Sequence, residues 1–142
     1  MLIMKLISGK VTYVHRSLWP QVVAVGCARD RWQMDGLTAA ARKLLASIDR
    51  APVEPGRTMR KAASELEARM LVYGAQFHSE SGAHLRRLES WRHWSNRMDA
   101  WHNGIRSAVA RTCLQGVLAS LNKEFGGKGV LPWQSKSHVV PG

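Results

Sequence analysis

Two short stretches of the sequence concentrate basic side chains that could hold phosphate groups. Guanidinium and ammonium groups neutralise phosphates and release the counterions condensed on a nucleic acid, which favours binding. Arginine also makes bidentate contacts with guanine, although its contacts with phosphate are as common and carry no sequence information. The candidate residues are Arg57, Arg60 and Lys61 in the first stretch and His84, Arg86 and Arg87 in the second.

The first stretch opens a predicted helix over residues 58–70. Thr58 is suited to cap this helix, because a threonine hydroxyl accepts a hydrogen bond from an unpaired amide of the first turn. The start of a helix also presents free amides and a positive dipole to a phosphate, and the three basic residues add full charges at the same end. The alternative interpretation is a solvated charged helix in which Glu65 and Arg69 pair four residues apart. The apolar stripe that would face the core consists of Met59, Ala62, Ala63, Leu66 and Met70.

The second stretch lies in a predicted β-hairpin. From Leu71 the apolar period changes from about 3.6 residues to 2, so a strand follows the helix directly. Residues 79–82 end in a glycine and suit a turn, and residues 83–88 can return as the partner strand. The competing interpretation is a helix, because apolar residues within 85–94 are spaced by three. A helix over residues 89–101 is expected to follow.

A further amphipathic helix precedes the basic one. It covers residues 38–50, with Thr38 as its N-cap and apolar residues at helical spacing. Two prolines and a glycine within residues 51–56 separate the two helices. Helix, helix and hairpin in this order are the parts of a winged helix-turn-helix, whose second helix enters the major groove of DNA. The order therefore predicts double-stranded DNA as the partner.

The remaining segments are expected to complete a single domain over residues 1–133. Residues 10–15 alternate as a short strand, residues 18–28 form a helix, and residues 29–36 make a polar connection. A last helix is predicted over residues 105–125. The predicted fold class is therefore α+β and mostly helical: a winged helix-turn-helix with one β-hairpin wing and a C-terminal helical extension.

The apolar and aromatic residues outside the wing are expected to fill the core. Cys27 and Cys113 have no metal-ligand spacing, and they indicate reduced core residues of a cytoplasmic protein. Tryptophans 19, 91 and 94 are interpreted as core packing more readily than as base-stacking platforms. Residues 134–142 follow no period and are expected to form a disordered tail. The stripe of the last helix consists of Ile105, Val109, Cys113, Val117 and Leu121, with Leu114 and Leu118 beside it.

The overall charge supports an anionic partner without locating its binding face. The chain carries a formal net charge of +11, but the basic residues are spread along its whole length. No apolar segment is long enough to span a bilayer, so no membrane partner is expected. His78 and His84 could face each other across the hairpin, but two histidines make an incomplete zinc site. There is no glycine-rich phosphate loop. We expect no metal and no cofactor.

Several blocks of the sequence carry a family resemblance. The blocks KLISGKVTYVHRSLWP, LTAAARKLL, RKAASELEARMLV, HSESGAHLRRLESW and LPW occur in this order between residues 5 and 133. Together they resemble a bacterial winged-helix DNA-binding family related to the AlkZ-like crosslink-repair DNA glycosylases. Members of that family typically carry further sequence before the first block, so the chain resembles their C-terminal portion.

The resemblance implies a DNA-repair context, but it does not carry over the catalytic motif. The related glycosylases use a Gln-x-Gln or Gln-x-Asp motif in an N-terminal winged-helix region. Gln33 and Asp35 match Gln-x-Asp in their letters, yet they fall in a connection at a different place in the fold. They are therefore weak candidates for a catalytic pair, and a solvated loop is the preferred interpretation of residues 33–35.

Three functional hypotheses follow from the sequence. The first is a non-enzymatic DNA-binding protein in DNA repair or transcription regulation. The second is a DNA glycosylase-like enzyme acting on damaged or crosslinked DNA, which would need a carboxylate or glutamine beside a flipped nucleotide. The third is a protein-interaction module in which the wing and the tryptophans form a homodimer interface.

Overall fold

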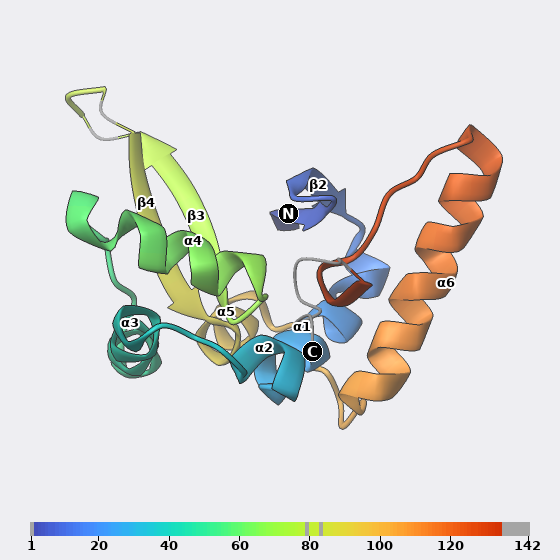
Figure 1. The fold of residues 1–142 in the computed structure, drawn as a ribbon, viewed down its shortest axis with the longest axis horizontal. Helices are drawn as coiled ribbons and strands as arrows, with labels where there is room; N and C mark the ends of the chain where they lie inside the picture. The colour runs from blue at the N-terminus through green and yellow to red at the C-terminus, as the bar shows by residue number, and fades with distance from the viewer. Residues whose placement is uncertain (1, 79, 83, 135–142) are drawn as a thin grey trace.

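The computed structural model describes residues 2–78, 80–82 and 84–134 as an α+β structure that is mostly helical (Figure 1). The predicted fold class is confirmed at this level. The strands of these residues form two antiparallel hairpins, β1–β2 and β3–β4. The strands are β1 (Leu2–Ile7), β2 (Lys10–Val14), β3 (Val72–His78) and β4 (His84–Ser90). The helices are η1 (Arg16–Leu18), α1 (Trp19–Ala28), α2 (Arg31–Met34), α3 (Ala39–Arg50), η2 (Arg57–Met59), α4 (Arg60–Ala68), α5 (Trp91–Met98), α6 (Ser107–Phe125) and η3 (Pro132–Gln134).

Helices α3 and α4 and the hairpin β3–β4 share one hydrophobic core, with the hairpin behind α4 in Figure 1. Leu44 and Ile48 of α3 meet Leu66 of α4 and Leu88 of β4, and all four side chains are buried. The strands pair directly from Val72 opposite Ser90 to the turn, so the helical alternative for this segment is wrong. This unit has the helix, helix and hairpin order that the sequence predicts.

Hydrogen bonds hold the start of α3 and the segment that follows α3. The Thr38 hydroxyl accepts a hydrogen bond from the Ala41 amide at 3.2 Å, which confirms Thr38 as the N-cap. Beyond α3, Val53 and Leu88 exchange backbone hydrogen bonds of 2.9 and 2.8 Å. Val53 therefore adds a one-residue bridge to the outer edge of β4 and closes the core at that side.

Glu65 joins α4 to the start of α3 and does not form the predicted pair with Arg69. Its carboxylate accepts hydrogen bonds from the Thr38 amide at 3.0 Å and from the Thr38 hydroxyl at 2.7 Å. Burial raises the pKa of Glu65, but these hydrogen bonds and the charges of Arg69 and Lys61 outweigh it and lower the pKa overall. The Arg69 guanidinium instead donates to the backbone carbonyls of Gln33 and Asp35.

A second core lies between the hairpin β1–β2 and helices α1, α5 and α6. Trp91 and Trp94 are buried at its centre, with ring centroids 5.6 Å apart and edge-on geometry. Trp19 packs against Trp94 at 5.3 Å, and the Trp91 indole donates to the Met70 carbonyl at 2.9 Å. The prediction that these three tryptophans fill the core is confirmed, so they cannot form the proposed dimer interface.

The structure contains elements that the sequence did not predict, among them strand β1 and helix α2. Strand β1 precedes the predicted strand 10–15 and pairs with it, so a second hairpin stands beside the wing. Helix α2 interrupts the predicted connection 29–36 with a single turn. The helix predicted over 89–101 is shorter, because Ser90 caps α5 by accepting from the His93 amide and Asp99 ends it with a positive φ of 52°. Most of the predicted tail, residues 135–142, lies outside the described residues.

Helix α6 is present, but it is rotated about its axis relative to the prediction. It buries Ala110, Leu114 and Leu118, whereas the predicted stripe is largely exposed. Cys27 and Cys113 are both exposed as well, so their prediction as core residues is wrong. None of the helices in the described part of the chain combines the length and the apolar character needed to cross a bilayer.

Candidate nucleic-acid interface

The basic residues predicted at the start of α4 stand free on the surface. Arg57 lies in the single turn η2, and Arg60 and Lys61 are the first residues of α4. All three side chains are exposed, and among the described residues none of them lies within 4 Å of a carboxylate oxygen. Three cations, none of them in an ion pair among the described residues, therefore occupy one helix start.

The same helix start has no side-chain cap. Thr58 falls inside η2, and the residue in the N-cap position of α4 is Met59, which makes no capping hydrogen bond. The predicted Thr58 cap is therefore wrong. The Arg60 amide donates to the Arg57 carbonyl of η2, and Gly56, the N-cap residue of η2, makes no capping hydrogen bond either. The first amides of η2 therefore have no side-chain acceptor, and an external phosphate can accept from such donors.

The wing presents its three predicted residues differently. Arg87 is exposed, while Arg86 points to the opposite face and its side chain is only 23% exposed, because it pairs with Glu67 at 3.2 Å. His84 pairs in register with His78 at the turn end of the hairpin, but both side chains lie outside the described part of the structure. Arg87 is thus the exposed basic residue of β4.

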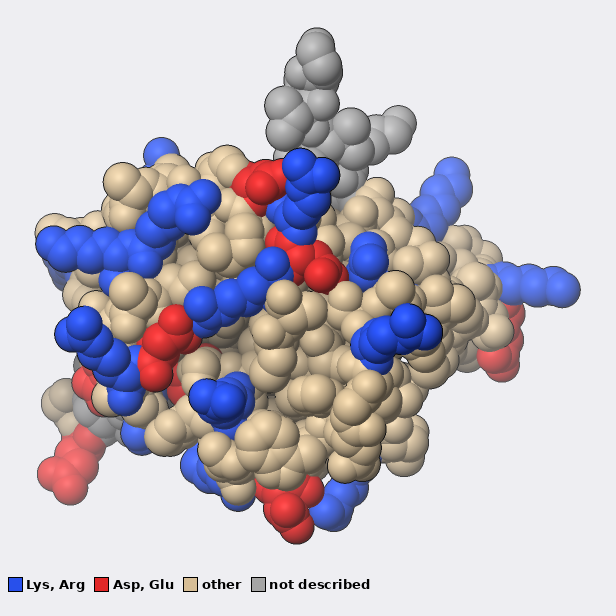
Figure 2. Space-filling model, turned by 90° about the horizontal axis from the view of Figure 1, so that it is seen from below, with Lys and Arg blue, Asp and Glu red and all other residues tan. Residues whose placement is uncertain are grey.

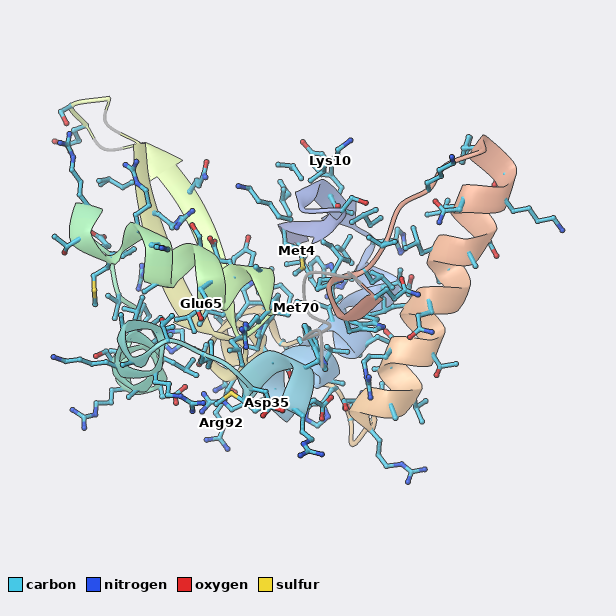
Figure 3. All side chains as sticks on the ribbon, viewed as in Figure 1. Met4, Lys10, Asp35, Glu65, Met70 and Arg92 are labelled. Carbon is cyan, nitrogen blue, oxygen red and sulfur yellow. The ribbon has the colours of Figure 1, made fainter. Side chains whose placement is uncertain are left out.

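The start of α4 and the turn of the β3–β4 hairpin lie at the same end of the molecule (Figure 1). The hairpin β1–β2 rises on the same side, with Lys10 at its outer end (Figure 3). Figure 2 shows the face seen from below, where basic side chains are scattered among acidic and neutral ones. That face is not a continuous cationic patch.

A cleft separates the hairpin β1–β2 from α4 and β3. Two adjoining pockets of about 280 and 540 Å³ occupy it. Lys5 lines both pockets from β1, Glu67 from α4 and Arg86 from β4. The cleft therefore carries a carboxylate between two cations, next to the helix that would meet DNA.

Glu67 is held close against strand β3. A Cβ atom on Gly74 would lie 1.7 Å from the Glu67 Oε1 atom, so only glycine lets the carboxylate reach this position. Burial raises the pKa of Glu67, although Arg86 and Lys5 oppose that shift. The sequence interpretation missed Glu67, but a glycine inside a strand signals such a close approach and could have pointed to it.

Gln33 and Asp35, the weak catalytic candidates, do not converge on a site. Gln33 is fully buried: its Nε2 donates to the carbonyls of Arg69 and Met70 at 3.2 and 3.3 Å, and its Oε1 accepts from the Asp30 amide at 2.8 Å. The carboxylate of Asp35 is 68% exposed. A solvated loop is therefore the wrong interpretation for Gln33, which ties α2 to the turn between α4 and β3.

Comparison of the chain with protein-family models, with curated proteins and with solved structures found no match. Within the described residues, no group of three or more His, Cys, Asp or Glu side chains is placed to hold a metal ion.

Proposed function

We propose that this chain is a non-enzymatic winged-helix protein that binds double-stranded DNA, in DNA repair or in transcription regulation. The observation that carries the proposal is the start of α4, where Arg57, Arg60 and Lys61 are exposed beside an uncapped helix terminus. This terminus belongs to the second helix of a helix, helix and hairpin unit, which is the element that such a fold lays against DNA.

The residues divide into two roles under this proposal. The three cations of α4 meet phosphates or base edges at the major groove, and Arg87 reaches the neighbouring backbone from the wing. Arg86 contributes less, because Glu67 already compensates its charge. Phosphate contacts dominate such an interface, so binding is strongly dependent on salt and weakly dependent on sequence.

Replacing Arg57, Arg60 and Lys61 together by alanine should weaken duplex binding roughly 10- to 100-fold at moderate salt. Each lost phosphate contact removes about 0.9 from the slope of log K against log salt concentration, so the slope should fall by about 2 to 3. Fluorescence anisotropy with a labelled duplex, repeated over a salt series, measures both quantities.

The matched control removes three positive charges from other surfaces. Lys43 of α3, Lys123 of α6 and Lys128, which follows α6, are exposed and belong to elements other than the start of α4. Their triple alanine variant should keep most of the affinity, and Arg87→Ala should cost more than Arg86→Ala. The proposal fails if the wild-type protein does not bind duplex DNA at low salt, or if both triple variants lose affinity equally.

The second candidate function is the glycosylase-like enzyme, and Glu67 is the observation that favours it. Such an enzyme needs a carboxylate in a pocket beside the DNA-contacting helix, and a general acid or base works best with a pKa shifted toward neutrality. Glu67 meets both conditions in the cleft, with a raised pKa caused first by burial. Gln33 cannot take this role, because backbone groups occupy its amide.

If the chain excises bases, Glu67→Gln should lower the release of modified base from alkylated duplex DNA roughly 100-fold, since it removes the proton-transferring group and keeps the shape. Glu54→Gln, at an exposed position outside the cleft, is the matched control. Chromatography of the released bases measures the rate. Absence of any release by the wild-type protein would remove the enzyme hypothesis and leave the DNA-binding proposal intact.

A further inference from the structure

Helix α6 exposes an apolar face that nothing in the described structure covers. Val109 is 54% exposed, Val117 37% and Leu121 42%, and Cys113 lies between them at the same spacing of four residues. The adjacent row of the helix, through Ala110, Leu114 and Leu118, is buried and packs on α1, which lies on one side of α6 in Figure 1. An exposed apolar row on a helix that already has its core face filled marks an interaction surface.

The apolar row is uncharged along its length and has one charged residue at each end. Between residues 112 and 122 the helix carries no charged side chain, although the chain as a whole has a net charge of +11. Arg106 and Glu124 bracket the apolar row, and neither belongs to an ion pair among the described residues. Arg106 is the N-cap residue of α6 and Glu124 lies in its last turn. They are eighteen residues apart, which is about five helical turns, so their Cα atoms fall near one line along the helix.

We propose that this face binds a second copy of the chain through an antiparallel pairing of the two α6 helices. A two-fold axis beside residue 115 places Arg106 of each copy opposite Glu124 of the other. The same operation places Val109 opposite Leu121 and Cys113 opposite Val117. Every apolar residue of the row then meets an apolar residue, and both bracketing charges meet their opposites, which is the self-complementarity that a two-fold interface requires.

The charge pattern favours a second copy over other occupants. A nucleic acid or an anionic membrane surface needs a row of cations. This face carries a single cation, Arg106, at one end of the apolar row. A parallel pairing would set Arg106 against Arg106 and Glu124 against Glu124. The antiparallel arrangement also opposes the two helix dipoles, and it keeps the cationic surfaces of a +11 chain away from the contact.

The interface is small, so the dimer should be weak. A helix of 19 residues is about 28 Å long, and one such pair buries less than the roughly 1,600 Å² of a standard interface. We expect a dissociation constant on the order of 10–100 µM without DNA. Sedimentation equilibrium over a concentration series from about 5 to 500 µM covers this range.

The Val117→Arg variant should stay monomeric across the whole concentration series, whereas the wild-type protein dimerises. The reason is that the substitution places two cations against the apolar row. Ser47→Arg is the matched control, since it adds the same charge at an exposed position of α3 and should leave the dimer unchanged. Circular dichroism of both variants checks that they remain folded. A wild-type protein that stays monomeric at the highest concentration overturns the proposal.

A cross-linking experiment tests the orientation of the two helices. One protein carries Cys27→Ser and keeps Cys113; the other carries Cys27→Ser, Cys113→Ser and Val117→Cys. Mixed and oxidised, they should form a covalent heterodimer, because these two positions face each other across the antiparallel pair. Each protein alone should cross-link at least 10-fold less, since its own cysteines are offset by about four residues, or 6 Å, along the axis in addition to the interhelical distance.

The outcomes separate this proposal from DNA binding. Cross-linking of the Cys113 protein with itself, in place of the mixture, would show a parallel pair and overturn the antiparallel assignment. Both experiments are done without DNA, so their failure says nothing against the cationic surface of α4. Conversely, a dimer that does not bind duplex DNA would retain this interface and contradict only the proposed function.

Discussion

Gly26→Ala should lower the free energy of unfolding by about 3 kcal/mol, since overpacking a filled core costs that much when the neighbours cannot move. A Cβ atom on Gly26 would lie 2.2 Å from Cδ1 of the Trp91 indole. Trp91 is itself only 1% exposed, and its Nε1 donates to the Met70 carbonyl, so the ring cannot turn away without losing that hydrogen bond. Urea unfolding followed by tryptophan fluorescence measures the change.

Gly116→Ala is the matched control, because Gly116 also lies inside a long helix but has open space where its Cβ would be. This substitution should raise the free energy of unfolding by up to about 1 kcal/mol, which is the difference in helix propensity between the two residues. Both variants are compared at a low concentration, where the protein is monomeric. If Gly26→Ala did not lower the free energy of unfolding, or if the two variants had the same free energy of unfolding, the close contact between α1 and Trp91 would be contradicted.

The contact at Gly26 shows which parts of the fold were predictable. Helix α3 and the hairpin β3–β4 follow from their own periods, because each has one face in the core and one in solvent. Gly26 carries no such signal: it lies inside an apolar helix, and its partner Trp91 is sixty-five residues away in the sequence. The pattern identifies a helix, but the close approach depends on tertiary packing.

Helix α6 shows a different limit of sequence interpretation. Its apolar residues occupy two adjacent rows, one through Val109 and Val117 and the other through Ala110 and Leu118. Both rows have the four-residue spacing of a helix face, so periodicity alone cannot decide which one packs on α1. The predicted stripe follows the row that is exposed, whereas Leu114 and Leu118, which the prediction set beside the stripe, are buried. A helix with two apolar rows is expected where two surfaces must be covered.

The candidate site was predictable only where local sequence determines the position of a residue. Arg57, Arg60 and Lys61 are recognisable as a charged helix start, since local sequence fixes their position. The pairing of Arg86 with Glu67 was not, because the side chains come from different elements and meet only after the hairpin folds onto α4. Long-range contacts between polar residues leave no period in a sequence.

The hydrogen bonds of Gln33 also join residues that are far apart in the sequence. Replacing Gln33 is expected to have the second large effect on stability. Gln33→Leu should lower the free energy of unfolding by about 3 kcal/mol, because it removes a partner from buried and half-buried donors and acceptors. The groups that lose a partner are the half-buried Asp30 amide and Arg69 carbonyl, at 2.8 and 3.2 Å, and the buried Met70 carbonyl, at 3.3 Å, which keeps its hydrogen bond from the Trp91 indole. Leucine keeps the apolar volume, so a cavity contributes little to this cost. Thermal and urea unfolding measure it.

Asp35→Ala is the matched control for Gln33. The Asp35 side chain is exposed, and the one ion pair that it makes within the described part of the chain, with Arg31 at 3.9 Å, is solvated on both sides. The substitution should therefore change stability by less than about 0.5 kcal/mol. If the two residues instead formed a catalytic pair, both variants would lose activity, and neither would need to lose stability. A large loss of stability in Gln33→Leu alone, with duplex binding retained at a temperature where the variant is folded, assigns Gln33 to the junction of α2, α4 and β3. Unchanged stability in Gln33→Leu would contradict that assignment and reopen a role for Gln33 in chemistry.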